Sequence, residues 1–237
     1  MGKRNVLFVM SSLRNGGAER SLVNLLQLLD YDRYNVDLLL FQNEGMFLKQ
    51  VPKAVNIISN CNKLYTLYDN NKAEALKHPY LSAIHMIGTF ISRKKTNSVA
   101  KSRQYRWEHF YKKIVPELTK EYDVAIAYMQ REQTYFLVDK VKAAKKIAWV
   151  HNEYSQLGHF KEMDLEYFEK VDKVVTISDL CAKDLKENFP SIAEKFVVLP
   201  NLTSSQVIRS LAKEFYPPEF RSCLLYTSPS PRDISGS

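Results

Sequence analysis

The sequence has few cysteines and no long apolar run. Its 237 residues include three cysteines, which are widely spaced and form neither a Cys-x-x-Cys pair nor a Cys/His cluster. We therefore expect no disulfide framework and no metal site, and we predict a reducing, cytoplasmic compartment. No run approaches the roughly 20 apolar residues that cross a bilayer, so an integral membrane protein is not expected.

Two glycine-rich nucleotide-binding motifs are also missing. The chain has seven glycines, and they form neither Gly-x-Gly-x-x-Gly nor Gly-x4-Gly-Lys-Ser/Thr. Nicotinamide chemistry and P-loop hydrolysis are therefore disfavoured. The composition, 45% hydrophobic and 25% charged, is typical of a soluble globular protein.

Acidic residues are scarce in one basic segment. The chain carries 34 Lys and Arg against 26 Asp and Glu, a net charge of +8. Residues 93–113 hold eight cations and one acid, Glu108, so this segment alone contributes +7. Such a balance favours a polyanionic partner, and because no nucleic-acid motif is present we expect no nucleic-acid partner.

The basic segment is predicted to contact an anionic membrane surface, because cations alternate there with aromatic residues at helical spacing. The alternative is a solvated helix whose aromatic stripe packs on the protein core. The predicted membrane-contact residues are Arg93, Lys94, Lys95, Lys101, Arg103, Arg106, Trp107, Lys112 and Lys113.

Alternating apolar runs and amphipathic stretches predict the fold class. Strands are expected at 5–10, 35–41, within 51–58, and at 122–128, 146–150, 173–177 and 196–199. Helices are expected at 18–29, 99–120, 133–142, 162–170 and 178–188. This alternation predicts an α/β doubly wound parallel sheet of about six or seven strands, with helices on both faces.

Ligands of such sheets bind beyond the carboxyl ends of the strands, which selects four candidate positions. Gly16 and Gly17 open a helix whose free N–H groups attract phosphate, or they form an ordinary flexible turn. His151 directly follows a strand and either meets a ligand near its ordinary pKa or bonds a neighbouring carbonyl. Ser178 is an anion-binding residue or a helix N-cap, and Asn201 binds ligand or makes a turn.

Four segments together carry a resemblance to a known family. They are residues 6–29 (VLFVMSSLRNGGAERSLVNLLQLL), 147–154 (IAWVHNEY), 171–185 (VDKVVTISDLCAKDL) and 194–202 (EKFVVLPNL). In order and spacing the chain resembles, over about residues 1–215, the N-terminal domain of family-4 retaining glycosyltransferases of the two-domain (B-type) fold. The resemblance implies hexosyl transfer from a nucleotide diphosphate sugar to a glycan or lipid-linked acceptor, as in polysaccharide biosynthesis, with no cofactor or metal.

The same resemblance implies roles for individual residues. Gly16 and Gly17 would lie against the donor phosphate or the transferred sugar, with Glu19 and Arg20 in the same motif. His151 would contact the sugar and is the candidate catalytic residue. Asn201 would mark the exit towards a second domain. The implied location is cytoplasmic, peripheral to the inner face of the cytoplasmic membrane.

One departure from the family is plain in the sequence. The family's second domain carries two glutamates separated by seven residues, and no glutamate here has another eight positions later. We therefore expect a truncated chain: a domain at 1–205, the start of a linker helix at 206–215, and a disordered or non-native tail at 216–237. Such a chain by itself would have little or no transferase activity. The rival reading is a non-catalytic α/β module that binds a phosphorylated ligand or a partner protein.

Overall fold

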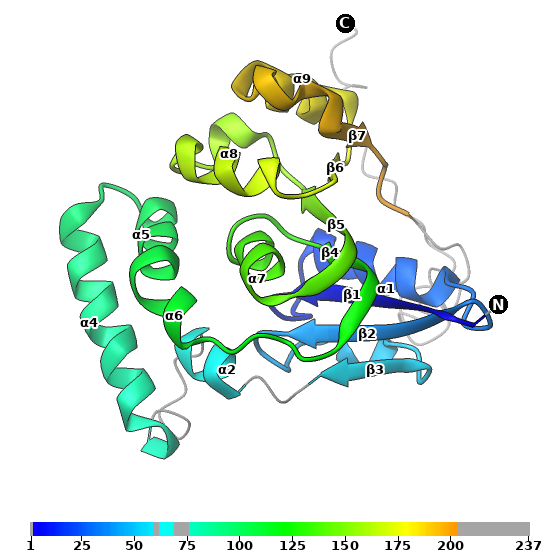
Figure 1. Cartoon of the computed structure of the whole chain (residues 1–237), viewed down its shortest axis with the longest axis horizontal. Helices are drawn as coiled ribbons and strands as arrows, with labels where there is room; N and C mark the ends of the chain where they lie inside the picture. Colours follow the sequence, from blue (N-terminus) through cyan, green and yellow to red (C-terminus); the bar gives the residue numbers. More distant parts are fainter. Residues whose placement is uncertain (1, 59–61, 69–75, 203–237) are drawn as a thin grey trace, which may run out of the picture. The chain divides into compact units, whose positions relative to one another are not determined.

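The computed structural model describes residues 2–58, 62–68 and 76–202. Within them, seven strands form one sheet in the order β3-β2-β1-β4-β5-β6-β7, and every neighbouring pair is parallel (Figure 1). The strands are β1 (Arg4–Met10), β2 (Tyr34–Leu40), β3 (Val55–Ile58), β4 (Glu121–Ala127), β5 (Lys142–Val150), β6 (Lys173–Thr176) and β7 (Phe196–Val198).

The central strands are apolar because both of their faces are buried. In β1, Leu7 and Val9 point into one core cluster, whereas Val6 and Phe8 point into the other. Side chains alternate between the faces of a strand, so a continuous apolar run fills two cores at once. For this reason the apolar runs of the sequence predicted where the strands lie.

Helices cover both faces of the sheet, as Figure 1 shows. Helix α1 (Gly17–Leu28) packs Leu22, Val23 and Leu26 into the core on one face. The other described helices contribute their apolar side chains mainly to the opposite core. They are α2 (Asn62–Tyr68), α4 (Pro79–Lys95), α5 (Val99–Arg106), α6 (Lys112–Ile114), α7 (Glu132–Lys140), α8 (Lys161–Glu169) and α9 (Asp179–Asn188), with short 3-10 turns at Leu48–Gln50, Tyr154–Gln156 and Pro190–Lys195.

The predicted fold class is thus confirmed, and the seven strands lie within a few residues of the expected positions. Two boundaries were wrong. The helix expected at 99–120 is α5, a π-helical turn at Trp107–Tyr111 and α6, and it ends at Ile114 because Pro116 disfavours helical geometry in the residue before it. The helix expected at 133–142 ends at Lys140, because Lys142 and Ala143 already pair with β4.

The helices between β3 and β4 form an insertion beside the sheet. We call α4, α5, the π-helical turn and α6 the α4–α6 insertion (79–114). The domain boundary expected at 205, the linker helix at 206–215 and the tail at 216–237 lie outside the described residues, so these predictions stay open.

Candidate functional site

The strand order reverses between β1 and β4, which is the position where sheets of this kind bind their ligands. From β1 the chain runs to β2 and β3 on one side, and from β4 to β5, β6 and β7 on the other. At such a switch point the connections leave the sheet in opposite directions and open a crevice beyond the carboxyl ends. The loops that follow β1, β4 and β5 therefore form the candidate site, which we call the carboxyl-edge site.

The Gly-Gly turn begins α1 without a side-chain cap. Gly16 is the N-cap in an extended conformation, and the Glu19 carboxylate lies in the space that a side chain at position 16 would need, 2.0 Å from the Cβ position. Gly17 is exposed, and a side chain there would meet no atom within 4 Å. The acid of the motif therefore lies at the helix N-terminus, where negative charge is favoured, and Arg20 is exposed.

A second loop holds this turn in place. Leu13 donates its N–H to the Glu44 carbonyl at 2.9 Å, Phe47 donates to the Leu13 carbonyl at 3.1 Å, and Arg14 pairs with the Glu44 side chain. Gly45 makes the close approach possible: its φ is +128°, and a Cβ there would lie 1.9 Å from the Leu13 carbonyl oxygen. Gly45 is a residue that sequence reasoning missed.

His151 lies buried at the end of β5 and is uncharged. Its Nε2 is 3.1 Å from the Tyr128 carbonyl oxygen, so that nitrogen carries the proton and donates it. Burial lowers the pKa of His151 from 6.5 to about 4, and the Tyr128 hydrogen bond only partly offsets this. The expectation of a titration near neutrality was therefore wrong, because the ring is removed from water.

The other ring nitrogen of His151 is an unpaired acceptor in the described part of the chain. Its Nδ1 is buried and has no hydrogen-bond partner among the described residues, and the same holds for Nε1 of Trp149. The two rings are parallel within 10°, with their centroids 6.0 Å apart. His151 Nδ1 is thus an acceptor and Trp149 Nε1 a donor without partners among the described residues, and Nδ1 can accept from a hydroxyl group but cannot donate to one.

Tyr128 joins α1 to the histidine. The Ser21 hydroxyl lies 2.9 Å from the Tyr128 hydroxyl and donates to Oδ1 of Asn201 at 2.9 Å, while the Tyr128 carbonyl accepts from His151. Asn24 donates to the Leu202 carbonyl at 3.0 Å. The structure thus brings the start of α1, His151 and Asn201 to one edge of the sheet.

Ser178 does not share this arrangement. Its hydroxyl accepts from the Cys181 N–H at 3.2 Å and caps α9, which is the structural alternative considered from the sequence. The capping bond uses this oxygen as an acceptor and leaves the O–H donor unassigned, so the anion contact stays a prediction.

Residues after β4 were missed by sequence reasoning. Gln130 accepts from the His151 N–H at 3.4 Å, and Arg131 holds the one positive φ of a non-glycine residue in the described chain, +72°. Strained backbone of this kind clusters at functional sites. The signal available was a run of polar residues, Gln130 to Glu132, directly after a buried strand.

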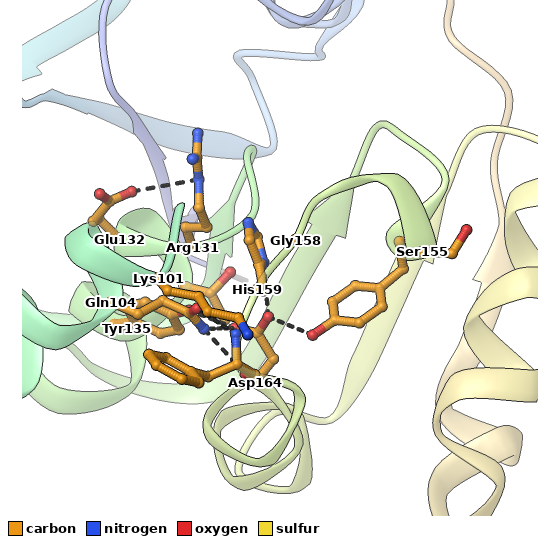
Figure 2. A network of polar contacts seen from close by, with 12 residues as sticks. Lys101, Gln104, Arg131, Glu132, Tyr135, Ser155, Gly158, His159 and Asp164 are labelled. Carbon is orange, nitrogen blue, oxygen red and sulfur yellow. Dashed lines mark hydrogen bonds and ion pairs between the residues drawn. The ribbon is translucent and has the colours of Figure 1, made fainter. Parts of the chain in front are cut away.

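Ion pairs stabilise the segment that follows β4. Glu132 is 1% exposed and pairs with Arg103 of α5 and, at 3.8 Å, with Arg131. Burial alone would raise the pKa of Glu132, but the two guanidinium groups outweigh it and lower the pKa. Figure 2 shows the Arg131–Glu132 pair beside a separate buried network.

That network centres on Asp164 of α8 and ties three helices together (Figure 2). Its carboxylate accepts from the Tyr135 and Tyr154 hydroxyls, from Nδ1 of His159 at 2.8 Å, and from Gln104 at 3.2 Å. Burial and the adjacent Asp164 charge raise the pKa of Tyr154. Nε2 of His159 has no partner among the described residues, but the other contacts close within the network, so we assign it to the packing of α5, α7 and α8.

Some side chains of the basic segment (93–113) are buried in the core, whereas others are exposed. Trp107 is 0% exposed, and its Nε1 donates to Asp139 at 3.0 Å, so its prediction as a membrane contact was wrong. The aromatic residues Trp107 and Tyr111 of this turn belong to the core, and Trp107 lies beside Tyr135 of α7.

Several cations of the segment also have partners within the protein. Arg103 pairs with Glu132, Arg106 donates to Ser92 and Ser102, and Lys101 lies over the Phe160 ring. Lys112 pairs with Glu108 and Asp139. These contacts weaken the membrane prediction for all four. The exposed residues that remain are Arg93, Lys94, Lys95 and Lys113.

No helix in the described part of the chain combines the length and the apolar character needed to cross a bilayer. Among the described residues there is also no group of three or more His, Cys, Asp or Glu side chains placed to hold a metal ion. The expectation that the chain needs neither metal nor cofactor stays a prediction.

Comparison with known proteins gives low similarity. Anabaena HepE, solved in complex with UDP and glucose, aligns with a TM-score of 0.45 and 14% identity, covering 89% of this chain and 50% of that one. HepE in complex with UDP-glucose gives 0.45 and 14%, covering 89% and 49%. The apo form of the lipopolysaccharide outer core galactosyltransferase WaaB gives 0.47 and 14%, covering 84% and 46%. The chain thus spans about half the length of the solved structures it matches.

No protein-family model matches the sequence, and no curated protein does. Structural likeness of the size just given carries no argument about activity. The fold assignment therefore rests on the strand order and on the parallel pairing of the sheet.

Proposed function

We propose that the chain is the N-terminal, acceptor-side half of a retaining hexosyltransferase of the two-domain (B-type) class, with a nucleotide diphosphate sugar as donor. One observation carries the proposal: the start of α1, His151 and Asn201 meet at the carboxyl edge through Ser21 and Tyr128. These positions belong to three of the segments on which the family resemblance rests.

The chemistry of the edge suits a sugar with a diphosphate. A phosphate approaching the N-terminus of α1 would displace the flexible Glu19 carboxylate from Gly16 and meet free N–H groups, with Arg20 nearby as an exposed cation. The neutral His151 ring would accept a hydrogen bond from a sugar hydroxyl at Nδ1. A buried, uncharged acceptor holds a hydroxyl without a competing charge.

An anionic membrane surface is the partner we propose for α4. This helix exposes Tyr80, Met86, Ile87 and Phe90 by 55 to 71%, which lie at helical spacing on one side. Arg93, Lys94 and Lys95 follow at its C-terminal end and are exposed. Each cation near an anionic leaflet contributes about 1 kcal/mol to the free energy of membrane binding. This end of α4 would therefore bind the membrane that carries a lipid-linked acceptor and keep that acceptor close to the site.

The test requires the downstream sequence of the source DNA, expressed in frame with this chain. We expect transfer of label from radiolabelled nucleotide sugars, with uridine diphosphate hexoses first because HepE was solved with UDP-glucose, to a lipid extract. His151→Ala should lower the rate about a hundredfold, whereas His109→Ala, an exposed histidine, should leave it unchanged. Absence of transfer with every donor would refute the proposal.

The chain as given supplies a second test. Because the resemblance assigns nucleotide binding to a second domain, these 237 residues alone should transfer no sugar. Robust turnover by them would overturn that part of the proposal. The alternative hypothesis, a module that only binds a phosphorylated ligand, predicts no sugar transfer by the 237-residue chain or by the protein extended in frame.

A further inference from the structure

A cavity of about 480 Å³ lies between α2, α4 and α5. Among the residues that the structure describes, no acidic side chain lines it. Its wall includes three arginines and three other polar side chains: Arg93, Arg103, Arg106, Tyr68, His85 and Thr89. The insertion therefore builds a cationic, polar hollow of its own.

Two of the three guanidinium groups lack a balancing acid. Arg103 pairs with the buried Glu132, but neither Arg93 nor Arg106 forms an ion pair with a carboxylate among the described residues. Arg106 is held instead by neutral partners, with its NH1 2.9 Å from Ser102 Oγ and 3.3 Å from Ser92 Oγ. Positive charge is thus fixed at the wall by groups that do not neutralise it.

The neighbouring histidine is consistent with this excess of charge. His85 lies 2.9 Å from the Tyr111 hydroxyl through Nδ1. Burial, and then the charge of Arg106, lowers the pKa of His85 below 6.5. At neutral pH the histidine adds no charge, so Arg93 and Arg106 define the sign of the potential in the cavity.

Three polar atoms of the same wall have no partner in the part of the chain that the structure describes. They are the Tyr68 hydroxyl, Thr89 Oγ1 and Arg106 Nε, and all three are shielded from solvent. Buried polar groups are nearly always hydrogen-bonded, and an orphan donor costs free energy. These residues line the cavity, so a ligand with several acceptor oxygens would satisfy the three donors once the side chains turn towards it.

We propose that the cavity binds a phosphate group, held by Arg93 and Arg106 and by hydrogen bonds from Tyr68 and Thr89. A phosphate carries enough acceptor oxygens for these donors, and guanidinium groups bind it with charge-assisted hydrogen bonds. The inference does not depend on the proposed sugar transfer, because it uses no residue of the carboxyl-edge site.

The phosphate could belong to a soluble compound or to a lipid headgroup. Arg93 lies three residues after Phe90 and seven after Met86, so the cavity mouth adjoins the exposed apolar side of α4. A lipid whose chains lie along that side would present its headgroup at the cavity. Both sources share the same chemistry at the wall.

The experiment measures binding of inorganic phosphate and glycerol phosphate to the full chain by calorimetry. Thr89→Val and Tyr68→Phe remove orphan hydroxyls, so each should leave the unliganded protein as stable as before or more stable, yet weaken binding severalfold. Arg106→Gln should weaken binding about tenfold or more. Lys113→Gln, an exposed cation outside the cavity, should change nothing.

Vesicles distinguish the two sources. Phosphatidylcholine vesicles containing phosphatidic acid are compared with vesicles of equal charge containing phosphatidylserine. Preference for phosphatidic acid that is lost in Thr89→Val identifies a lipid phosphate, whereas binding of soluble phosphate without that preference identifies a soluble ligand. The proposal is overturned if neither phosphate nor phosphatidic acid binds, or if Thr89→Val and Arg106→Gln bind as the unchanged protein does.

Discussion

The carboxyl-edge site and the α4–α6 insertion differ in which of their groups have partners within the protein. At the carboxyl edge, Ser21, Tyr128, His151 and Asn201 form a chain of hydrogen bonds, and His151 Nδ1 is a neutral acceptor without a partner among the described residues. In the insertion, Arg93 and Arg106 line a cavity without an ion-pair partner in the described part of the chain, and α4 leaves apolar side chains exposed. The first region is thus held mostly by hydrogen bonds within the protein, whereas the second has charged and apolar groups that a partner would satisfy.

The largest expected effect tests where the aromatic residues of the insertion belong. Trp107→Ala should lower the free energy of unfolding by about 3–5 kcal/mol, because a fully buried indole and its bond to Asp139 are lost. Tyr80→Ala, an exposed aromatic residue of α4, should change it by less than about 0.5 kcal/mol. Urea unfolding measures both. If Trp107→Ala is as stable as the unchanged protein but no longer binds vesicles, Trp107 contacts the membrane and its assignment to the core is wrong.

A smaller effect tests how the carboxyl edge is held. Gly45→Ala should destabilise the chain by about 2 kcal/mol, since a left-handed φ is strained for alanine and its Cβ meets the Leu13 carbonyl. Gly17→Ala is the matched control, with open space at the first turn of α1, and should be neutral or stabilising. If both glycine variants unfold at the same urea concentration, the loop after β2 does not support the Gly-Gly turn.

The pH dependence of stability tests the burial of His151. The unfolded chain takes up a proton as the pH falls below 6.5, but the folded chain does so only near pH 4. The free energy of unfolding should therefore fall across this window, by about 2 kcal/mol at pH 5. His151→Asn should remove this part of the slope and His109→Asn should not. A His151 ring that titrates near pH 6.5 by NMR would contradict the assigned burial.

The smallest effect on stability concerns the exposed side of α4. Phe90→Ala should leave unfolding nearly unchanged, because the ring is 62% exposed and contacts Lys94 mainly through a cation–π interaction at 4.4 Å. Its binding to anionic vesicles should fall severalfold and weaken with added salt. Cosedimentation measures this, and binding independent of Phe90 and of lipid charge would remove the membrane contact.

The sequence was sufficient for features fixed by local pattern. Apolar runs such as 5–10 located strands, and Ser178 was weighed as an N-cap because capping depends on residues three apart. The carboxyl-end rule also placed the Gly-Gly turn and His151 on one edge, since parallel strands end together.

Features that depend on distant partners could not be predicted in this way. Arg103 finds Glu132 29 positions later, and helical spacing shows a stripe at Trp107 without showing what covers it. The unusual pKa of His151 follows from burial under neighbouring strands and rings, which no local pattern records. The need for glycine at position 45 appears only when two loops meet.

The central claim is that the Gly-Gly turn and His151 face one ligand. The most direct measurement is an NMR titration with uridine diphosphate glucose of the protein extended in frame by the downstream sequence, following the Gly16 and Gly17 amides and the His151 ring. We predict that these signals shift together with a common dissociation constant, while the amides near Gly88 in α4 stay fixed. Shifts confined to the turn or to the imidazole alone, or different constants for the two, would contradict the account.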